Sequence, residues 1–110
     1  MLKGDAKTGR ELLVALRRDA KHLFDLPIGS HDVPVYESAM VGDMECWGLA
    51  ICHPDYYIFL DPSVPKHQRR RTLLHEALEV INDIYDLGQD ERGIRILENA
   101  LWQIFRKQKL

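Results

Sequence analysis

The chain has 110 residues, of which 45% are hydrophobic and 29% charged, as is typical of one folded domain. The net charge of −2 gives no excess of positive charge to attract nucleic acid or an anionic membrane. No apolar run approaches the roughly 20 residues of a membrane span, and the first ten residues, MLKGDAKTGR, lack the apolar stretch of a signal peptide. We therefore expect a single domain over residues 1–110, a cytoplasmic location, and neither a nucleic-acid nor a membrane partner.

The N-terminal part of the chain predicts one helix followed by a strand. Apolar side chains recur at helical spacing over residues 12–24, and Pro27 and Gly29 follow as helix terminators. The next stretch, HDVPVYESAM (31–40), alternates weakly between polar and apolar residues, which indicates a short strand. Pro34 cannot donate a ladder hydrogen bond, so we expect this strand at an edge of the sheet.

The middle of the chain predicts a β-hairpin. Two runs rich in strand-forming residues, 46–52 and 56–60, flank the sequence HPD, whose proline and aspartate favour a turn. Cys46 and Cys52 stand at the two ends of the first run, about 20 Å apart in an extended strand. A disulfide needs Cα atoms within about 7 Å of one another. We therefore expect two free, buried thiols.

The C-terminal part predicts two helices. In residues 61–88, Ser63 can cap a helix, Pro65 suits its first turn and Gly88 suits its C-terminal end. A second helix follows, with Asp90 as its N-cap. The short connection makes the two helices antiparallel. The order of elements predicts an α+β fold with an N-terminal helix, a small antiparallel sheet and two C-terminal helices.

The first of these helices carries the sequence RTLLHEALEV (71–80), which comes close to the zinc-binding pattern H-E-x-x-H. His75 and Glu76 match the pattern, and Glu79 stands where the second histidine is expected. On a helical wheel all three fall on the polar half. His75 and Glu79 are i, i+4 neighbours that could both bind a divalent metal, and Glu76 could act as a general base.

An ordinary surface explains the same pattern. Acidic helix faces are usually solvated, and a histidine–glutamate pair at this spacing is worth a few tenths of a kcal/mol. The basic run KHQRRR (66–71) precedes the acidic face, and we expect it to pair within the chain rather than with nucleic acid. The motif alone therefore leaves a metal site and a solvated helix face both open.

The order of motifs resembles that of the zincin-type metallopeptidases, in particular small phage and bacterial proteins of the ImmA/IrrE-like group. The resemblance covers roughly residues 44–105 and rests on YYIFLDPSVPKHQRRRTLLHEALEVI and ERGIRILENALWQIF. Its most specific element is TLLHE directly after the basic run. It implies that His75 is a metal ligand, that Glu76 is the general base, and that Glu79 occupies the place of the second ligand. Zinc is the metal that it implies.

The third ligand has two candidates. The resemblance places it on Glu91, at the start of the last helix. The geometry of a tight antiparallel helix pair points instead nearer to Glu98, which lies level with Glu79. We favour Glu91 and keep Glu98 as the alternative.

Two functions follow from the resemblance. The first is a zinc-dependent peptidase, a hydrolase that receives an extended peptide at an edge strand of the 44–60 hairpin. The second is a binding or regulatory protein, of phage origin, that keeps the zincin fold without its chemistry. Glu79 makes the ligand set more negative and poorer in nitrogen, which weakens the case for catalysis more than that for metal binding. Together with the expected cytoplasmic location, the resemblance to phage and bacterial proteins implies the cytoplasm of a bacterium, including a phage-infected or lysogenic one.

Overall fold

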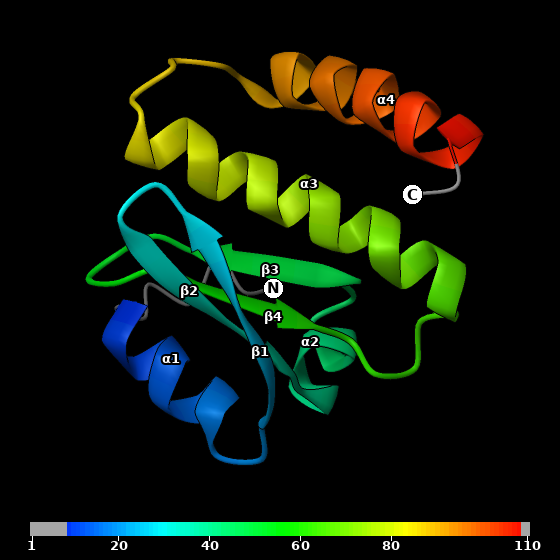
Figure 1. Ribbon diagram of the computed structural model, residues 1–110. Coiled ribbons are helices and arrows are strands. Elements are labelled where there is room, and N and C mark those ends of the chain that lie inside the picture. The colour runs from blue at the N-terminus through cyan, green and yellow to red at the C-terminus, as the bar shows by residue number, and fades with distance from the viewer. Residues whose placement is uncertain (1–8, 109–110) are drawn as a thin grey trace.

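The computed structural model describes residues 9–108 and has the expected α+β class. Residues 1–8 lie outside the described residues. They include most of the first ten residues, in which the sequence predicts no signal peptide. The elements in chain order are α1 (Gly9–Arg17), β1 (Lys21–Ile28), β2 (His31–Glu37), α2 (Ala39–Asp43), β3 (Gly48–Ile51), β4 (Tyr57–Leu60), α3 (Lys66–Ile84) and α4 (Glu91–Gln108) (Figure 1).

The four strands form a mixed sheet in the order β1-β2-β4-β3, which corrects the expected antiparallel sheet. The β1–β2 and β3–β4 hairpins are antiparallel, whereas β2 and β4 run parallel, with Tyr36 opposite Phe59. The short helix α2 carries the chain from β2 to β3, and β4 then returns between them. This arrangement leaves β3 as an edge strand.

The N-terminal helix is shorter than predicted, because part of its periodic segment forms β1. Leu23 and Leu26 pack as strand side chains against the buried cluster beneath α3. Gly29, with φ of 61°, makes the turn into β2. From residue 21 onward the apolar spacing fits a strand as well as a helix. Pairing with β2 makes this part of the chain a strand.

The strand β2 lies inside the sheet, so its predicted edge position is wrong. Pro34 pairs with Asp25 of β1, but the pairing of β2 with β4 covers only residues 35–37. Pro34 therefore has a neighbouring strand on one side only, as it would at a true edge.

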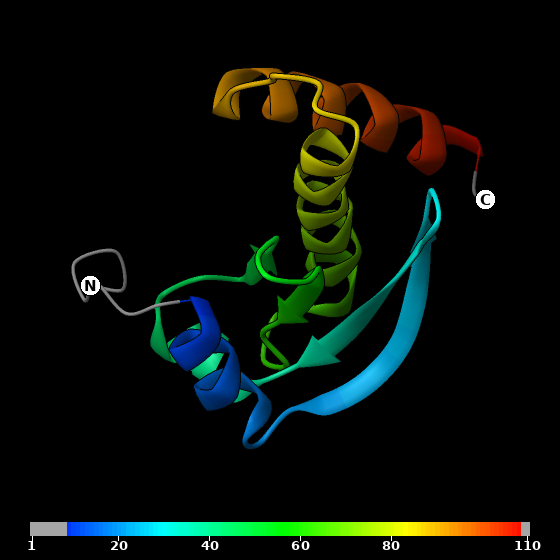
Figure 2. The same cartoon turned by 90° about the vertical axis from the view of Figure 1, so that its left-hand side faces the viewer.

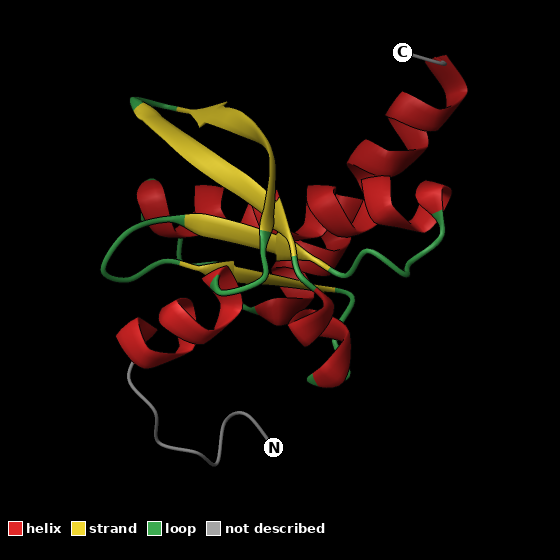
Figure 3. Cartoon of the chain, turned by 90° about the horizontal axis from the view of Figure 1, so that it is seen from below, coloured by secondary structure: helices red, strands yellow, loops and turns green. Residues whose placement is uncertain are grey.

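Helices cover both faces of the sheet (Figure 3). On one face α3 packs over a cluster that includes Val33, Val35, Ile58, Leu60 and Val80. On the other face α1 and α2 cover a second cluster: Leu13, Leu16, Val41, Ile51 and Phe59. The last helix, α4, crosses the outer side of α3, away from the sheet (Figure 2). As a result α3 is the one element that lies between the sheet and α4.

The helix ends follow local sequence rules only in part. The Asp90 side chain accepts a hydrogen bond from the backbone N–H of Gly93 at 2.9 Å, which confirms the predicted cap of α4. Ser63 does not cap α3, because its backbone and hydroxyl both bond to the Asp61 carboxylate. Gly88 has the expected positive φ, but α3 has already ended at Ile84.

Two further expectations concern the chain as a whole. Cys46 and Cys52 are free thiols, as predicted, and both are half-buried rather than buried. No helix among residues 9–108 is both long enough and apolar enough to cross a membrane.

Candidate metal centre

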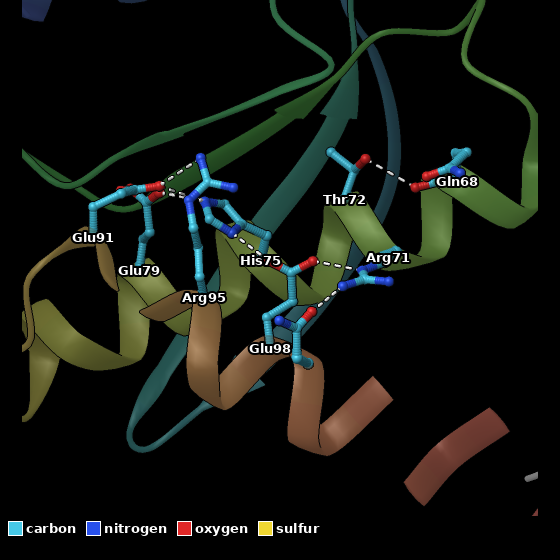
Figure 4. A network of polar contacts seen from close by, with 9 residues as sticks. Gln68, Arg71, Thr72, His75, Glu79, Glu91, Arg95 and Glu98 are labelled. Atoms are coloured by element: carbon cyan, nitrogen blue, oxygen red, sulfur yellow. Dashed lines mark hydrogen bonds and ion pairs between the residues drawn. The ribbon is translucent and has the colours of Figure 1, made fainter. Parts of the chain in front are cut away.

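The motif residues of α3 point to two different neighbours. Glu76 lies against Gly48 of β3. His75 and Glu79 face α4, where Glu91 lies close to them (Figure 4). Because α3 lies between these two layers, Glu76 is buried and His75 is mostly covered, whereas 37% of the Glu79 side chain remains exposed.

Glu76 is buried, with only 7% of its surface exposed. The helical wheel places it on the polar half of the helix, but that half is not exposed to solvent at this position. The cause lies on the edge strand. A Cβ atom at Gly48 would lie 2.5 Å from Cγ2 of Thr72 and 3.0 Å from Cγ of Glu76. Glycine at this position lets β3 approach α3 closely enough to cover the carboxylate.

The burial of Glu76 changes its acidity. Burial, followed by the charge of Glu79, raises the pKa of Glu76 from 4.5 to about 8, and His75 only partly offsets this. A carboxylic acid with such a pKa is largely protonated at neutral pH in the metal-free protein. Loss of contact with water is the main cause, and the neighbouring charge of Glu79 adds to it.

His75 stands among three carboxylates. Its Nε2 atom lies 2.9 Å from Oε2 of Glu79 and 3.6 Å from Oε2 of Glu91, and its Nδ1 atom lies 2.7 Å from Oε1 of Glu98. The structure thus brings both candidate third ligands to His75, on opposite nitrogens. Burial disfavours the imidazolium, but the hydrogen bond to Glu98 and the charges of Glu76 and Glu79 outweigh it and raise the pKa of His75.

A second group of contacts surrounds Glu98. Its Oε2 atom accepts a 2.7 Å hydrogen bond from Nε of Arg71, which also donates to the side-chain oxygen of Asn99. The guanidinium of Arg71 lies 6.0 Å from the ring centre of Trp102. Burial opposes ionisation of Glu98, but the bonds from Arg71 and His75 outweigh it and lower its pKa.

Sequence reasoning did not identify Arg71 as part of this site. The available signal was its spacing, since Arg71 precedes His75 by one helical turn. Within the basic run, Arg69 also bonds inside the chain, to the carbonyl oxygens of Pro62 and Val64. The remaining basic side chains of the run, Lys66, His67 and Arg70, are exposed.

The donor atoms fit a divalent cation. His75, Glu76 and Glu79 each offer one donor atom, and the three atoms lie within 4.8 Å of one another. Glu91 adds a carboxylate from α4 on the Nε2 side of His75. Imidazole and carboxylate donors suit zinc and other divalent metals. A cation would also favour the ionised form of Glu76, whose pKa is raised first by burial and then by the charge of Glu79.

Two side chains beside the motif were not predicted to belong to it. Cys52 follows the end of β3, and its burial together with the charges of Asp83, Glu79 and Glu76 raises its pKa to about 11. Its thiol is therefore a poor nucleophile at neutral pH. The Tyr56 hydroxyl donates a 2.7 Å hydrogen bond to Asp83, one helical turn after Glu79.

No protein-family model, characterised protein or solved structure matches the chain. What can be inferred about function therefore rests on the donor geometry around His75, the buried Glu76 and the edge strand beside it.

Proposed function

We propose that the protein is a zinc-dependent hydrolase that cleaves peptide bonds. The observation that supports this best is the position of Nε2 of His75, which faces the carboxylates of Glu79 and Glu91 while the buried acid Glu76 lies next to it. The resemblance of TLLHE and its flanking segments to zincin-type peptidases supports the same reaction class.

In this proposal His75, Glu79 and Glu91 hold the metal. A bound zinc ion would supply Lewis acidity, which polarises a carbonyl group and makes water a nucleophile near neutral pH. Glu79 contributes an anionic oxygen where a second imidazole would contribute nitrogen, so this ligand set favours a weaker Lewis acid or a harder divalent cation.

Glu76 serves as the proton carrier. Gly48 and Thr72 shield it from bulk water, and its pKa of about 8 without metal shows how strongly this environment favours the protonated form. A carboxylate in such a place accepts the proton of an attacking water readily and can pass it on to the leaving amine.

The edge strand β3 supplies the place for a substrate. Its outer side has no neighbouring strand within the described sheet, and Gly48 at its start contacts Glu76. An extended peptide that adds to β3 by main-chain hydrogen bonds would pass beside the carboxylate. The proposed substrate is therefore an unfolded or extended segment of peptide or protein.

Metal content is the direct test. The protein, purified without chelators, is expected to carry about one zinc per chain by elemental analysis, because one imidazole and two carboxylates converge at Nε2 of His75. A folded protein that neither retains metal nor takes up added zinc would contradict the proposal.

A second candidate is a binding protein that uses the fold without a metal. It is favoured by Arg95, whose Nη2 atom lies 3.4 Å from the same Glu91 oxygen that faces His75. In that case side-chain cations neutralise the carboxylates. A metal-free protein in which Arg95→Ala lowers stability would favour this candidate. For either function we propose a location in the cytoplasm of a bacterium.

A further inference from the structure

We propose that Glu98, held in place by Arg71, is a positioning residue that turns Nε2 of His75 toward the metal ligands. This inference rests on the proposed metal site and assigns Glu98 a role other than that of a ligand. It concerns the orientation of one imidazole ring and the contacts that fix it.

Both oxygens of Glu98 are already engaged. Oε1 lies 2.7 Å from Nδ1 of His75, and Oε2 lies 2.7 Å from Nε of Arg71. Only the other nitrogen of the ring, Nε2, faces Glu79 and Glu91. Glu98 is thus bound to the side of His75 that points away from the proposed ligands.

The elements that carry these residues explain why they meet. Arg71, His75 and Glu79 follow one another at one-turn intervals along α3. Glu91 and Glu98 are two turns apart on α4, and that helix crosses α3 so that each carboxylate meets a different nitrogen (Figure 4). The side chains of His75 and Glu98 are only 17% and 12% exposed, so water competes weakly for this contact.

A neutral imidazole has one donor and one acceptor nitrogen, and a metal needs the acceptor. A carboxylate that accepts from Nδ1–H leaves the lone pair on Nε2 and also fixes the rotation of the ring. Arg71 prevents Glu98 from turning away, because it binds the second oxygen of the carboxylate. The pair therefore prepares His75 for a metal without contacting the metal itself.

The test compares zinc affinity in three variants, measured by titration against a competing chelator. We expect Glu98→Ala to weaken zinc binding about 10- to 100-fold, as is typical for the loss of an outer carboxylate partner of a ligand. Glu98→Gln keeps an oxygen acceptor and should lose less. Asn99→Ala is the matched control, because Asn99 touches Arg71 but not His75. The zinc affinity of this variant should equal that of the wild type.

A second readout does not depend on metal. In the metal-free wild type the imidazole Nδ1–H of His75 should give a sharp proton resonance in NMR spectra, because a buried carboxylate accepts it. In Glu98→Ala this resonance should broaden through exchange with water, while far-UV circular dichroism shows that the helices remain.

The outcomes separate this inference from the proposed function. Zinc binding by the wild type with equal affinity in Glu98→Ala and Asn99→Ala would overturn the positioning role alone. Persistence of the sharp Nδ1–H resonance in Glu98→Ala would also overturn it. A wild type that binds no zinc would overturn the metal site itself, whichever result the NMR experiment gives.

Discussion

Gly48 and Glu76 are in contact across two elements: a Cβ atom at Gly48 would lie 3.0 Å from Cγ of the glutamate. The edge strand and the proposed general base can approach this closely only because residue 48 has no Cβ atom. This contact buries Glu76, raises its pKa and places it beside the strand proposed to receive substrate.

Gly48→Ala should weaken both the fold and the site. The added methyl group would lie 2.5 Å from Cγ2 of Thr72, so strand and helix must move apart. Overpacking of this kind costs about 1–3 kcal/mol in the free energy of unfolding, measurable by urea denaturation. Adding Thr72→Ser, which removes Cγ2 and keeps the hydroxyl that bonds to Gln68, should restore part of the loss. No recovery in the double variant would mean that the crowding lies elsewhere.

His75→Ala should remove most of the bound metal and leave the protein folded. His75 is the only nitrogen donor in the cluster and is not part of either buried hydrophobic cluster. Elemental analysis and far-UV circular dichroism measure the two effects. Metal content equal to that of the wild type would exclude this site.

Glu76→Gln should abolish peptide hydrolysis and retain metal, because an amide cannot accept the proton. The two measurements are a peptidase assay and elemental analysis on the same preparation. A variant that still hydrolyses peptide at the wild-type rate would remove Glu76 from the mechanism.

The same substitution should change how stability depends on pH in the chelator-treated protein. The pKa of Glu76 is about 8 in the folded state against 4.5 for an unperturbed glutamate, so above pH 4.5 the unfolded chain binds fewer protons than the folded one. The free energy of unfolding then falls as pH rises from about 4.5 to 8, by up to about 5 kcal/mol from this group. Urea unfolding at pH 5 and pH 8.5 should show a smaller fall in Glu76→Gln. An identical fall in both proteins would show that Glu76 ionises normally.

Glu79→His should tighten zinc binding. Oε2 of Glu79 lies 2.9 Å from Nε2 of His75, so a residue at this position faces the donors of the proposed site. The change replaces an anionic oxygen by a neutral imidazole, which suits zinc, and removes one of the charges that raise the pKa of Glu76. Competition with a chelator measures the affinity of both proteins. Equal or weaker binding in the variant would indicate that position 79 does not contact a metal.

Features set by local sequence could be predicted. The helix that carries the motif, the β3–β4 hairpin and the Asp90 cap each depend on residues close together in the chain. The parallel pairing of β2 with β4 could not be predicted, because it joins strands separated by a helix and another strand. The strand β1 was missed because its apolar spacing also fits a helix, and only the pairing with β2 decides between them.

Only those contacts of the site that lie within the single helix α3 could be predicted from the sequence. Spacing along α3 correctly placed His75 and Glu79 next to each other. The burial of Glu76 depends on Gly48, a residue of another element, which a helical wheel cannot include. The separate positions of Glu91 and Glu98 depend on the angle at which α4 crosses α3, and sequence does not reveal that angle.

The last helix, α4, carries the proposed ligand Glu91 and the proposed positioning residue Glu98, and its main packing partner is α3 rather than the sheet. Release of α4 would therefore separate these carboxylates from His75 while the sheet stays folded. A metal that binds only while α4 is packed on α3 stabilises that packed form by mass action. Backbone amides of α4 should consequently exchange hydrogen for deuterium more slowly as zinc is added, while amides of the sheet change little. Zinc binding and the packing of α4 on α3 would then be coupled, so that a change in either one changes the other.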